Sequence, residues 1–77
     1  MPKLEIFGAA SCPFSQEMRE SLEYQNREFL YHDVDADPAA RARLHALAAA
    51  PRMVPVLVED GKVVQVGWQG QGCPVFD

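Results

Sequence analysis

The order of periodic segments constrains the fold of this chain more than any other feature. Residues 3–8, KLEIFG, alternate in side-chain character and end in glycine, which is typical of a β-strand. Residues 12–25, CPFSQEMRESLEYQ, place Phe14, Met18 and Leu22 on one face of an expected helix, with Pro13 at its first position. Residues 28–34, EFLYHDV, are rich in aromatic and branched side chains and predict a second strand. This order predicts a parallel βαβ unit.

The second half of the chain predicts another helix and then an antiparallel finish. Residues 35–50 offer Asp37 as N-cap and Pro38 as first helical residue. The apolar stripe of this helix consists of Ala40, Leu44, Leu47 and Ala48. Asp60-Gly61, between two valine-rich runs, predicts a β-hairpin. We therefore expect one α/β domain over residues 1–77, with a βαβαββ core at about 3–67, a four-stranded mixed sheet, two helices and an irregular, glycine-rich tail at 68–77.

The composition argues against several classes of protein. The chain has 77 residues, 48% hydrophobic and 23% charged, as is typical of one globular domain. A net charge of -4 and scattered Lys and Arg argue against nucleic-acid and anionic membrane partners. No secretory leader or bilayer-length apolar run is recognisable, so we expect a cytoplasmic protein. Two cysteines are too few for a secreted disulfide framework, and in a reducing cytosol they indicate catalytic, metal-binding or redox-sensing roles.

Cys12 is the first candidate for chemistry because it is expected at the N-terminus of the first helix. Unpaired backbone N–H groups and the positive end of the helix dipole stabilise a thiolate there, which lowers the thiol pKa from about 8.5. Pro13 has no N–H, so the expected donors are the backbone of Phe14 and Ser15, with the Ser15 hydroxyl as a third. The alternative is a small buried hydrophobic residue. We favour a reactive thiol, because open α/β sheets place their sites at the carboxyl edge of the sheet.

These residues resemble the glutaredoxins and their small thioredoxin-fold relatives. The resemblance rests on CPFS after the first strand, RMVP before a valine-rich strand, and the short βαβαββ chain over about residues 3–67. It implies a truncated thioredoxin-like fold in which Cys12 is the nucleophile and Ser15 occupies the place of the resolving cysteine, as in monothiol members. It also implies that Pro55 corresponds to the family's cis-proline facing Cys12, which leaves the Val54 backbone free to pair with a bound thiol peptide.

The sequence departs from the family pattern where glutathione is usually held. The lysine that usually precedes the nucleophile is absent from GAAS at residues 8–11. The Gly-Gly turn and Asp-containing helix start of the family are replaced by GWQGQGC at residues 67–73. These departures argue against tight glutathione binding, and we expect no required cofactor. Within this stretch, Trp68, Gln69 and Gly70 resemble the Trp-Ser-Gly-Phe segment of glutaredoxin-like electron donors that thioredoxin reductase reduces.

Cys73 offers a replacement for the partner that is missing at position 15. The expected hairpin returns at Val66 to the sheet edge that carries Cys12, and six further residues can span at most about 20 Å. A disulfide between Cys12 and Cys73 is therefore feasible. We hypothesise that Cys12 attacks a substrate disulfide and that Cys73 resolves the resulting mixed disulfide. The alternative, which the sequence leaves equally open, is that Cys73 is an incidental cysteine of the tail.

A second group of residues is expected to form the surface on which a substrate lies. By position and resemblance, these residues are Pro13, Phe14, Val54, Pro55 and Trp68. Trp68 has an alternative role, shared with Val75 and Phe76, of covering the sheet face that the family's missing third helix leaves bare. If the tail does not cover that face, we expect a dimer to do so; otherwise the chain is a monomer.

The histidines and one arginine have simpler explanations than a metal site. No pair of Cys and His has zinc-ligand spacing, so we predict no metal site. We expect His32 within the second strand and His45 on the solvent side of the second helix. Arg52 either lies near the thiolate or is a solvated loop residue.

The leading functional hypothesis is a small thiol-disulfide oxidoreductase that acts on protein or small-molecule disulfides. Its reductant is either glutathione or a reductase of the thioredoxin reductase type. One alternative is a carrier of an iron–sulfur cluster held between two subunits with glutathione, as in monothiol glutaredoxins, although those carry Cys-Gly-Phe-Ser. Another is a binding module that kept the fold without catalysis, in which the Cys12 thiol would titrate in its ordinary range.

Overall fold

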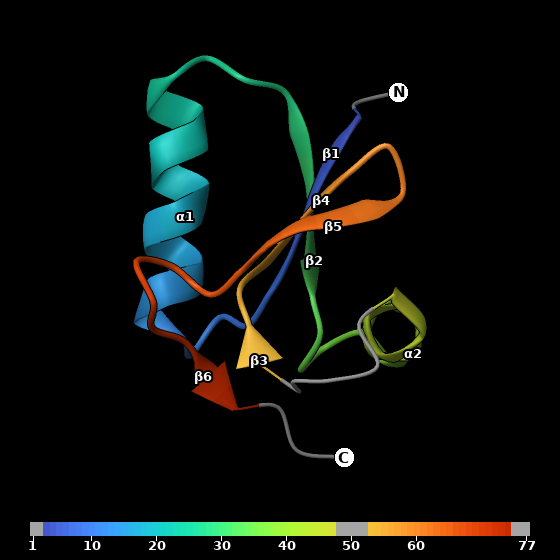
Figure 1. Cartoon of the computed structure of the whole chain (residues 1–77). Coiled ribbons are helices and arrows are strands. Elements are labelled where there is room, and N and C mark those ends of the chain that lie inside the picture. The colour runs from blue at the N-terminus through green and yellow to red at the C-terminus, as the bar shows by residue number, and fades with distance from the viewer. Residues whose placement is uncertain (1–2, 48–52, 75–77) are drawn as a thin grey trace.

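The computed structural model describes residues 3–47 and 53–74, in which it contains two helices and six strands. In chain order these elements are β1 (Leu4–Gly8), α1 (Pro13–Tyr24), β2 (Phe29–Asp33), α2 (Pro38–Leu47), β3 (Met53–Val54), β4 (Val56–Glu59), β5 (Lys62–Val66) and β6 (Cys73–Pro74) (Figure 1). Neither described helix is long and apolar enough to cross a bilayer. The α/β class expected from the sequence is confirmed.

Four strands form a mixed sheet in the order β2-β1-β4-β5. β1 lies parallel to β2, with Ile6 opposite Tyr31, as expected when a crossover helix joins the two strands. β4 runs antiparallel to β1, with Ile6 opposite Leu57, and β5 returns antiparallel to β4. The parallel start and the antiparallel finish predicted from the sequence are both present, and β1 is flanked on both sides.

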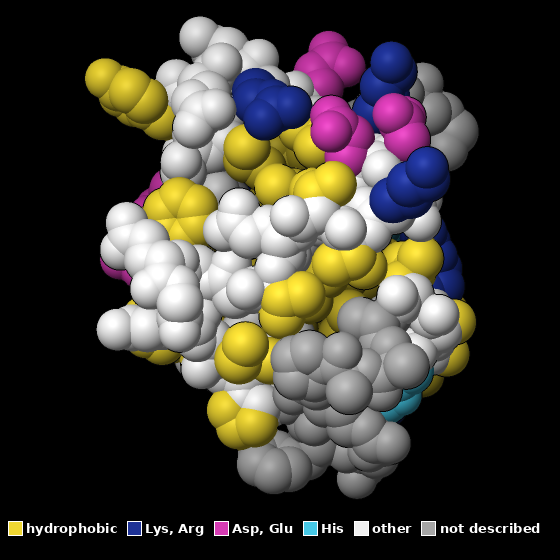
Figure 2. All heavy atoms as spheres, in the orientation of Figure 1, with side chains coloured by type: hydrophobic (Ala, Val, Ile, Leu, Met, Phe, Trp, Pro, Cys, Tyr) yellow, Lys and Arg dark blue, Asp and Glu magenta, His cyan; other side chains and the backbone are white. Residues whose placement is uncertain are grey.

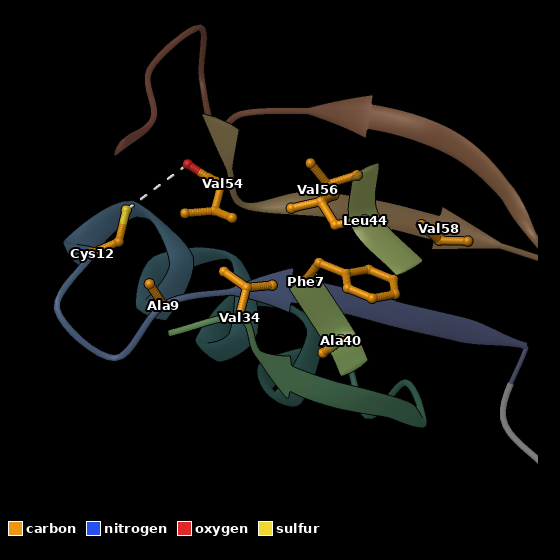
Figure 3. Close-up of a cluster of buried hydrophobic side chains, with 9 residues drawn as sticks. All are labelled: Phe7, Ala9, Cys12, Val34, Ala40, Leu44, Val54, Val56 and Val58. Carbon is orange, nitrogen blue, oxygen red and sulfur yellow. Dashed lines mark hydrogen bonds between the residues drawn. The ribbon is translucent and has the colours of Figure 1, made fainter. Parts of the chain in front are cut away.

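The two helices cover opposite faces of this sheet (Figure 1). On one face, the α1-face cluster consists of the buried side chains of Ile6, Met18 and Leu22. On the other, the α2-face cluster consists of the buried side chains of Phe7, Ala9, Cys12, Val34, Ala40, Leu44, Val54, Val56 and Val58 (Figure 3). The neighbours Ile6 and Phe7 belong to different clusters because side chains alternate along a strand. Cys12 is therefore an integral part of one core.

The hairpin between β4 and β5 turns at Asp60 and Gly61. Their φ angles are 53° and 78°, so both residues occupy the left-handed region. Two such residues in succession make the type I′ turn that suits a two-residue hairpin, and Asp-Gly is among its preferred sequences. The sequence prediction is confirmed at residue level.

The starts of both helices also follow the sequence. The Asp37 carboxylate accepts hydrogen bonds from the backbone N–H groups of Ala39 (3.0 Å) and Ala40 (3.4 Å), so Asp37 is the N-cap of α2. α1 begins at Pro13, directly after Cys12 in an extended conformation. Ala48, expected in the apolar stripe of the second helix, lies outside the described residues.

The buried stripe of α1 differs from the predicted one. The structure buries Ser15, Met18 and Leu22, whereas Phe14 is half-buried and packs against the α2-face cluster. A repeat of four residues drifts by about 40° around a helix at each step, so the predicted stripe from Leu22 leaves the core face by position 14. Position 15 lies almost in line with Leu22, and Ser15 was overlooked because a hydroxyl does not signal a core position.

The tail is also more ordered than the sequence predicts. Cys73 and Pro74 form β6, which pairs antiparallel with β3 so that Val54 lies opposite Cys73 and Met53 opposite Pro74. In Figure 1 the two short strands lie side by side, next to the start of α1. The expectation of an irregular tail was wrong for this segment, since a two-residue strand is too short to show any periodicity in the sequence.

Candidate functional site

The site is built around Cys12, which is the N-cap of α1. Its backbone has φ −96° and ψ 113°, and its carbonyl oxygen accepts the first helical hydrogen bond, from the Gln16 N–H, at 3.3 Å. Its own N–H donates to the carbonyl of Ala9 at 3.0 Å, which fixes the loop between β1 and α1. The first turn of α1 contains no acidic residue. The Cys12 sulfur is therefore held at the positive end of a helix that carries no carboxylate nearby in sequence to oppose a thiolate.

Cys12 and Cys73 are joined by a disulfide, although 61 positions separate them in the chain. Their Cα atoms are 5.9 Å apart, within the usual span of such bridges. Both cysteines of the chain are thereby paired. Cys12 is only 1% exposed, whereas Cys73 is half-buried. The two cysteines singled out from the sequence are thus brought into direct contact, and the nucleophile candidate is the more deeply buried of the two.

The third component of the site is the segment from Val54 to Pro55. The peptide bond between these two residues is cis, as the resemblance to glutaredoxins implies. The Val54 carbonyl oxygen lies 3.9 Å from the Cys12 sulfur, and Figure 3 shows that sulfur pointing toward it. Val54 and Pro55 are both buried. Cys12, Val54 and the tail cysteine therefore meet at one edge of the structure.

A tight turn at residues 68–71 places Cys73 at this edge. The backbones of Trp68 and Gln71 exchange two hydrogen bonds, of 2.7 and 2.9 Å, and the two residues between them have positive φ. Gly67 precedes the turn with φ +82°, and its N–H donates to the Pro55 carbonyl at 2.7 Å. A Cβ at Gly67 would lie 2.8 Å from the Gln71 carbonyl oxygen, so this position requires glycine. The tail is folded back by this turn, where the sequence suggested a flexible linker.

Ser15 is engaged with the loop before α1. Its hydroxyl oxygen is buried and accepts a hydrogen bond from the Ala9 N–H at 3.2 Å, and the Tyr31 hydroxyl approaches Gly8 from the same side. These contacts direct it toward the loop and β2, and its expected bond to a Cys12 thiolate stays a prediction, because the Cys12 sulfur is bonded to Cys73 here. Gly8 allows this arrangement, because a Cβ there would lie 2.7 Å from the Tyr31 hydroxyl and 2.8 Å from the Ser15 Cβ.

Ser15 is linked to Cys12 through the backbone of Ala9. The Ser15 hydroxyl holds the N–H of Ala9, and the carbonyl of Ala9 holds the N–H of Cys12. Burial raises the pKa of Tyr31, and the negative charge of Asp33 raises it further, so the phenol stays protonated near neutral pH. Sequence reasoning missed Tyr31, Gly8 and Gly67. Of these, only Gly8 was noted in the sequence, as the glycine that ends the first strand. The reason for glycine there, the close approach of two side chains, is seen only in the structure.

The expected substrate surface is only partly assembled at this edge. Val54 and Pro55 lie beside Cys12, and Pro13 is exposed directly after it. Phe14 and Trp68 are both half-buried but point to different cores. Trp68 packs against the α1-face cluster, which agrees with its alternative role of covering a sheet face.

A sequence model of the family described as Glutaredoxin matches residues 4–64, most of the chain. The chain belongs to the glutaredoxin family. Two crystal structures of the thioredoxin-like protein BC3987, one of them a point mutant, resemble this glutaredoxin with TM-scores of 0.77 (mutant) and 0.76. They are 35% and 34% identical to it, cover 90% and 87% of its chain, and are themselves covered to 86% and 89%.

A more distant structure supports the fold alone. The glutaredoxin grx-1 from Archaeoglobus fulgidus is 22% identical, with a TM-score of 0.76, covering 90% of this chain and 78% of its own. A search of curated proteins finds no match. Family and fold together support a role in thiol-disulfide oxidoreduction. The assignment to monothiol members, which CPFS suggested, is not confirmed by these comparisons.

The remaining candidates of this glutaredoxin lie apart from the sulfur atoms. Within residues 3–47 and 53–74, no group of three or more His, Cys, Asp or Glu side chains could hold a metal ion. His32 lies in β2 as expected, whereas His45 is half-buried, which corrects its expected place on the solvent side of α2. Arg52, Val75 and Phe76 lie outside the described residues, so their expected roles stay predictions.

A charged cluster occupies the α2 face of the sheet. The Arg43 guanidinium binds both carboxylate oxygens of Glu5, at 2.9 and 3.3 Å, and His32 Nε2 lies 2.8 Å from one of them. The hydrogen bond from Arg43, together with that from His32, holds the pKa of Glu5 below its ordinary value. His32 stacks on Phe7 with ring centroids 4.7 Å apart, and Arg43 lies over the same ring. This cluster therefore stabilises the contact between α2 and the sheet.

Proposed function

We propose that this glutaredoxin is a thiol-disulfide oxidoreductase in which Cys12 is the nucleophile and Cys73 the resolving cysteine. The observation that carries the proposal is the contact between a cysteine at the N-terminus of α1 and a cysteine from a distant tail segment. A thiolate is favoured at the helix terminus, so Cys12 is the better attacking group. Cys73 has no helix terminus of its own, since it lies in β6. In this proposal, Cys73 supplies from the tail the second thiol that the chain lacks at position 15.

The reaction transfers two electrons in two exchange steps. The Cys12 thiolate attacks one sulfur of a substrate disulfide, forms a mixed disulfide with it, and releases the other substrate sulfur as a thiolate. The Cys73 thiolate then attacks the Cys12 sulfur, which forms the intramolecular disulfide and releases the second substrate thiolate. The protein dithiol is oxidised and the substrate disulfide is reduced. An external dithiol, or two equivalents of a thiol such as glutathione, returns the protein to its reduced state.

Three forms of the protein test this assignment with bis(2-hydroxyethyl) disulfide as substrate. The reduced wild type should lose the mass of two hydrogens and yield a peptide linked between Cys12 and Cys73. The Cys73→Ser variant should stop at a mixed disulfide on Cys12, because the second step has no thiol. The Cys12→Ser variant should react at the rate of an ordinary exposed thiol or more slowly. An adduct that accumulates on Cys73 in the wild type, with Cys12 free, would reverse the two roles.

A further inference from the structure

The tail strand β6 occupies the backbone edge next to Cys12. Cys73 lies opposite Val54 in an antiparallel pair, and Val54 is the residue whose carbonyl oxygen lies 3.9 Å from the Cys12 sulfur. One position of the tail therefore makes two contacts at once, a strand pairing with Val54 and a covalent bond with Cys12. A substrate cysteine in an extended segment would need the same two contacts during its mixed disulfide. The tail and such a segment cannot occupy this edge together.

The residue before Cys73 fits this edge only because it is glycine. A Cβ at Gly72 would lie 2.6 Å from the Val54 carbonyl oxygen and 2.6 Å from Cγ of Met53. It would also lie 2.8 Å from Sδ of Met53. The Met53 side chain can move, but the Val54 carbonyl belongs to the backbone that lines the site. Any larger residue at this position must push the paired strand away from β3.

The pairing of β6 with β3 is weak without its disulfide. Each strand contributes two residues, and Pro74, opposite Met53, has no N–H to donate. An isolated pair of such short strands is marginal in water. Reduction of the disulfide therefore leaves a segment that can detach and expose the edge of β3.

The described residues around this edge present little charge. Figure 2 shows their hydrophobic and uncharged atoms at β6 and β3, while most of the Lys, Arg, Asp and Glu side chains in this view lie toward the end that carries the turn of the β4–β5 hairpin. Backbone pairing and close steric fit are therefore the means of recognition that this face offers.

We propose that the β3 edge accepts an extended peptide with glycine directly before its reactive cysteine, and that residues 71–74 occupy this edge in the oxidised protein as an internal copy of that peptide. The proposal rests on the function proposed above and adds the selectivity of the site. The substrate class is a protein or peptide disulfide in which the attacked cysteine follows a glycine. When Cys73 resolves the mixed disulfide, two replacements occur together. The strand β6 takes the place of the substrate segment beside Val54, and the Cys73 sulfur takes the place of the substrate sulfur on Cys12.

Two blocked tetrapeptides test the selectivity directly. The sequences Gln-Gly-Cys-Pro, which copies residues 71–74, and Gln-Ala-Cys-Pro are each prepared as a mixed disulfide with thionitrobenzoate. The reduced Cys73→Ser variant attacks the peptide sulfur through Cys12, and the released thionitrobenzoate reports the rate. We expect the glycine peptide to react about tenfold faster or more, since the added Cβ meets the Val54 carbonyl. Mercaptoethanol as attacking thiol should react equally with both peptides and corrects for their intrinsic reactivity.

The outcomes separate the two proposals. Equal rates of both peptides with the protein would overturn the glycine selectivity and leave the role of Cys12 intact. If neither peptide labels Cys12, the proposed function is overturned, and the selectivity with it. Labelling with the expected preference supports both.

A second measurement, made on the whole protein, tests whether residues 71–74 fit closely against the edge of β3. Gly72→Ala adds the Cβ that meets the Val54 carbonyl, whereas Gln71→Ala shortens an exposed side chain and leaves its backbone bonds in place. In a dithiothreitol redox buffer, we expect the equilibrium constant for reduction of the disulfide to be about tenfold larger in Gly72→Ala than in the wild type. The constant for Gln71→Ala should equal that of the wild type. An unchanged equilibrium in Gly72→Ala would refute the close fit of β6 on β3.

Discussion

The β4–β5 hairpin and the β3–β6 pair are both antiparallel and both lie next to a tight turn, but different forces hold them. β4 and β5 are joined by the turn at Asp60-Gly61 and continue into a sheet that is packed on both faces. β6 follows the turn at Gln69-Gly70, pairs over two residues and is tied down by a disulfide. The same turn chemistry thus leads into a strand of the main sheet in one place and into a two-residue strand held by a disulfide in the other. What differs is the apolar area that the strands bury.

The largest expected effect comes from breaking the main sheet. Phe7 is fully buried in the α2-face cluster and also supports the His32 and Arg43 side chains. We expect Phe7→Ala to lower the free energy of unfolding by about 3 to 5 kcal/mol, in the oxidised and the reduced protein alike. Urea unfolding followed by circular dichroism measures it. Val64→Ala, at a 54% exposed position of β5, is the control and should change little.

The second largest effect is expected from reducing the disulfide, which should release the β3–β6 pair and leave the main sheet intact. The disulfide closes a loop of about 61 residues, so its reduction should lower the free energy of unfolding by about 2 to 4 kcal/mol. Hydrogen exchange shows where order is lost. The amides of residues 53–54 and 73 should lose protection on reduction, while those of Ile6 and Leu57 keep theirs relative to global unfolding. Equal loss in both sheets would show that β6 is needed for the whole fold.

A smaller effect is expected from Ser15→Ala, which tests the hydrogen-bonded link from Ser15 through Ala9 to Cys12. Ser15→Ala leaves the buried N–H of Ala9 without its acceptor, which should cost about 1 to 2 kcal/mol of stability. Because Ala9 also holds the Cys12 N–H, the variant should alter the pH profile of Cys12 alkylation in the reduced protein. Ser21→Ala, on the outer part of the same helix, is the matched control. Lower stability with an unchanged profile would make Ser15 a purely structural residue.

The smallest effect concerns the charged cluster on the α2 face. Arg43 and His32 lower the pKa of Glu5, so the cluster stabilises the fold above the ordinary pKa of 4.5 and loses this contribution as the pH falls through the lowered value. Glu5→Gln should therefore cost about 1 kcal/mol at pH 7, and its difference from the wild type should shrink toward pH 3. Glu23→Gln, in an exposed ion pair with Arg19, should show no such difference at any pH.

The comparison also explains how much could be predicted from the sequence. The main sheet, both helices and the Asp60-Gly61 turn follow from periodicity and turn chemistry, which are local signals. The place of Cys12 at the start of α1 follows in the same way, from Pro13 and the helical stripe after it. A feasible bridge from Cys12 to Cys73 could be inferred from chain length and topology, because the hairpin had to return to the same edge.

The rest depends on contacts between distant segments, which leave no periodic signal. β6 could not be predicted because its two residues pair with β3 only once the Gln69-Gly70 turn is formed. The burial of Ser15 depends on the Tyr31 hydroxyl and the Ala9 N–H, both outside α1. The requirement for glycine at position 72 comes from the Val54 carbonyl, eighteen positions earlier in the chain.

The burial of Cys12 beneath the tail has a consequence for the survival of the protein under oxidative stress. Thiolates that remain accessible to peroxide advance to sulfinic and sulfonic acids, most of which no cellular reductant reverses. Here Cys12, the proposed nucleophile, is bonded to Cys73 and only 1% exposed, while Cys73 is half-buried. The disulfide thus shields the proposed nucleophile from irreversible oxidation. In the proposed cycle, a thiol that attacks the more exposed Cys73 sulfur releases Cys12 as a free thiolate.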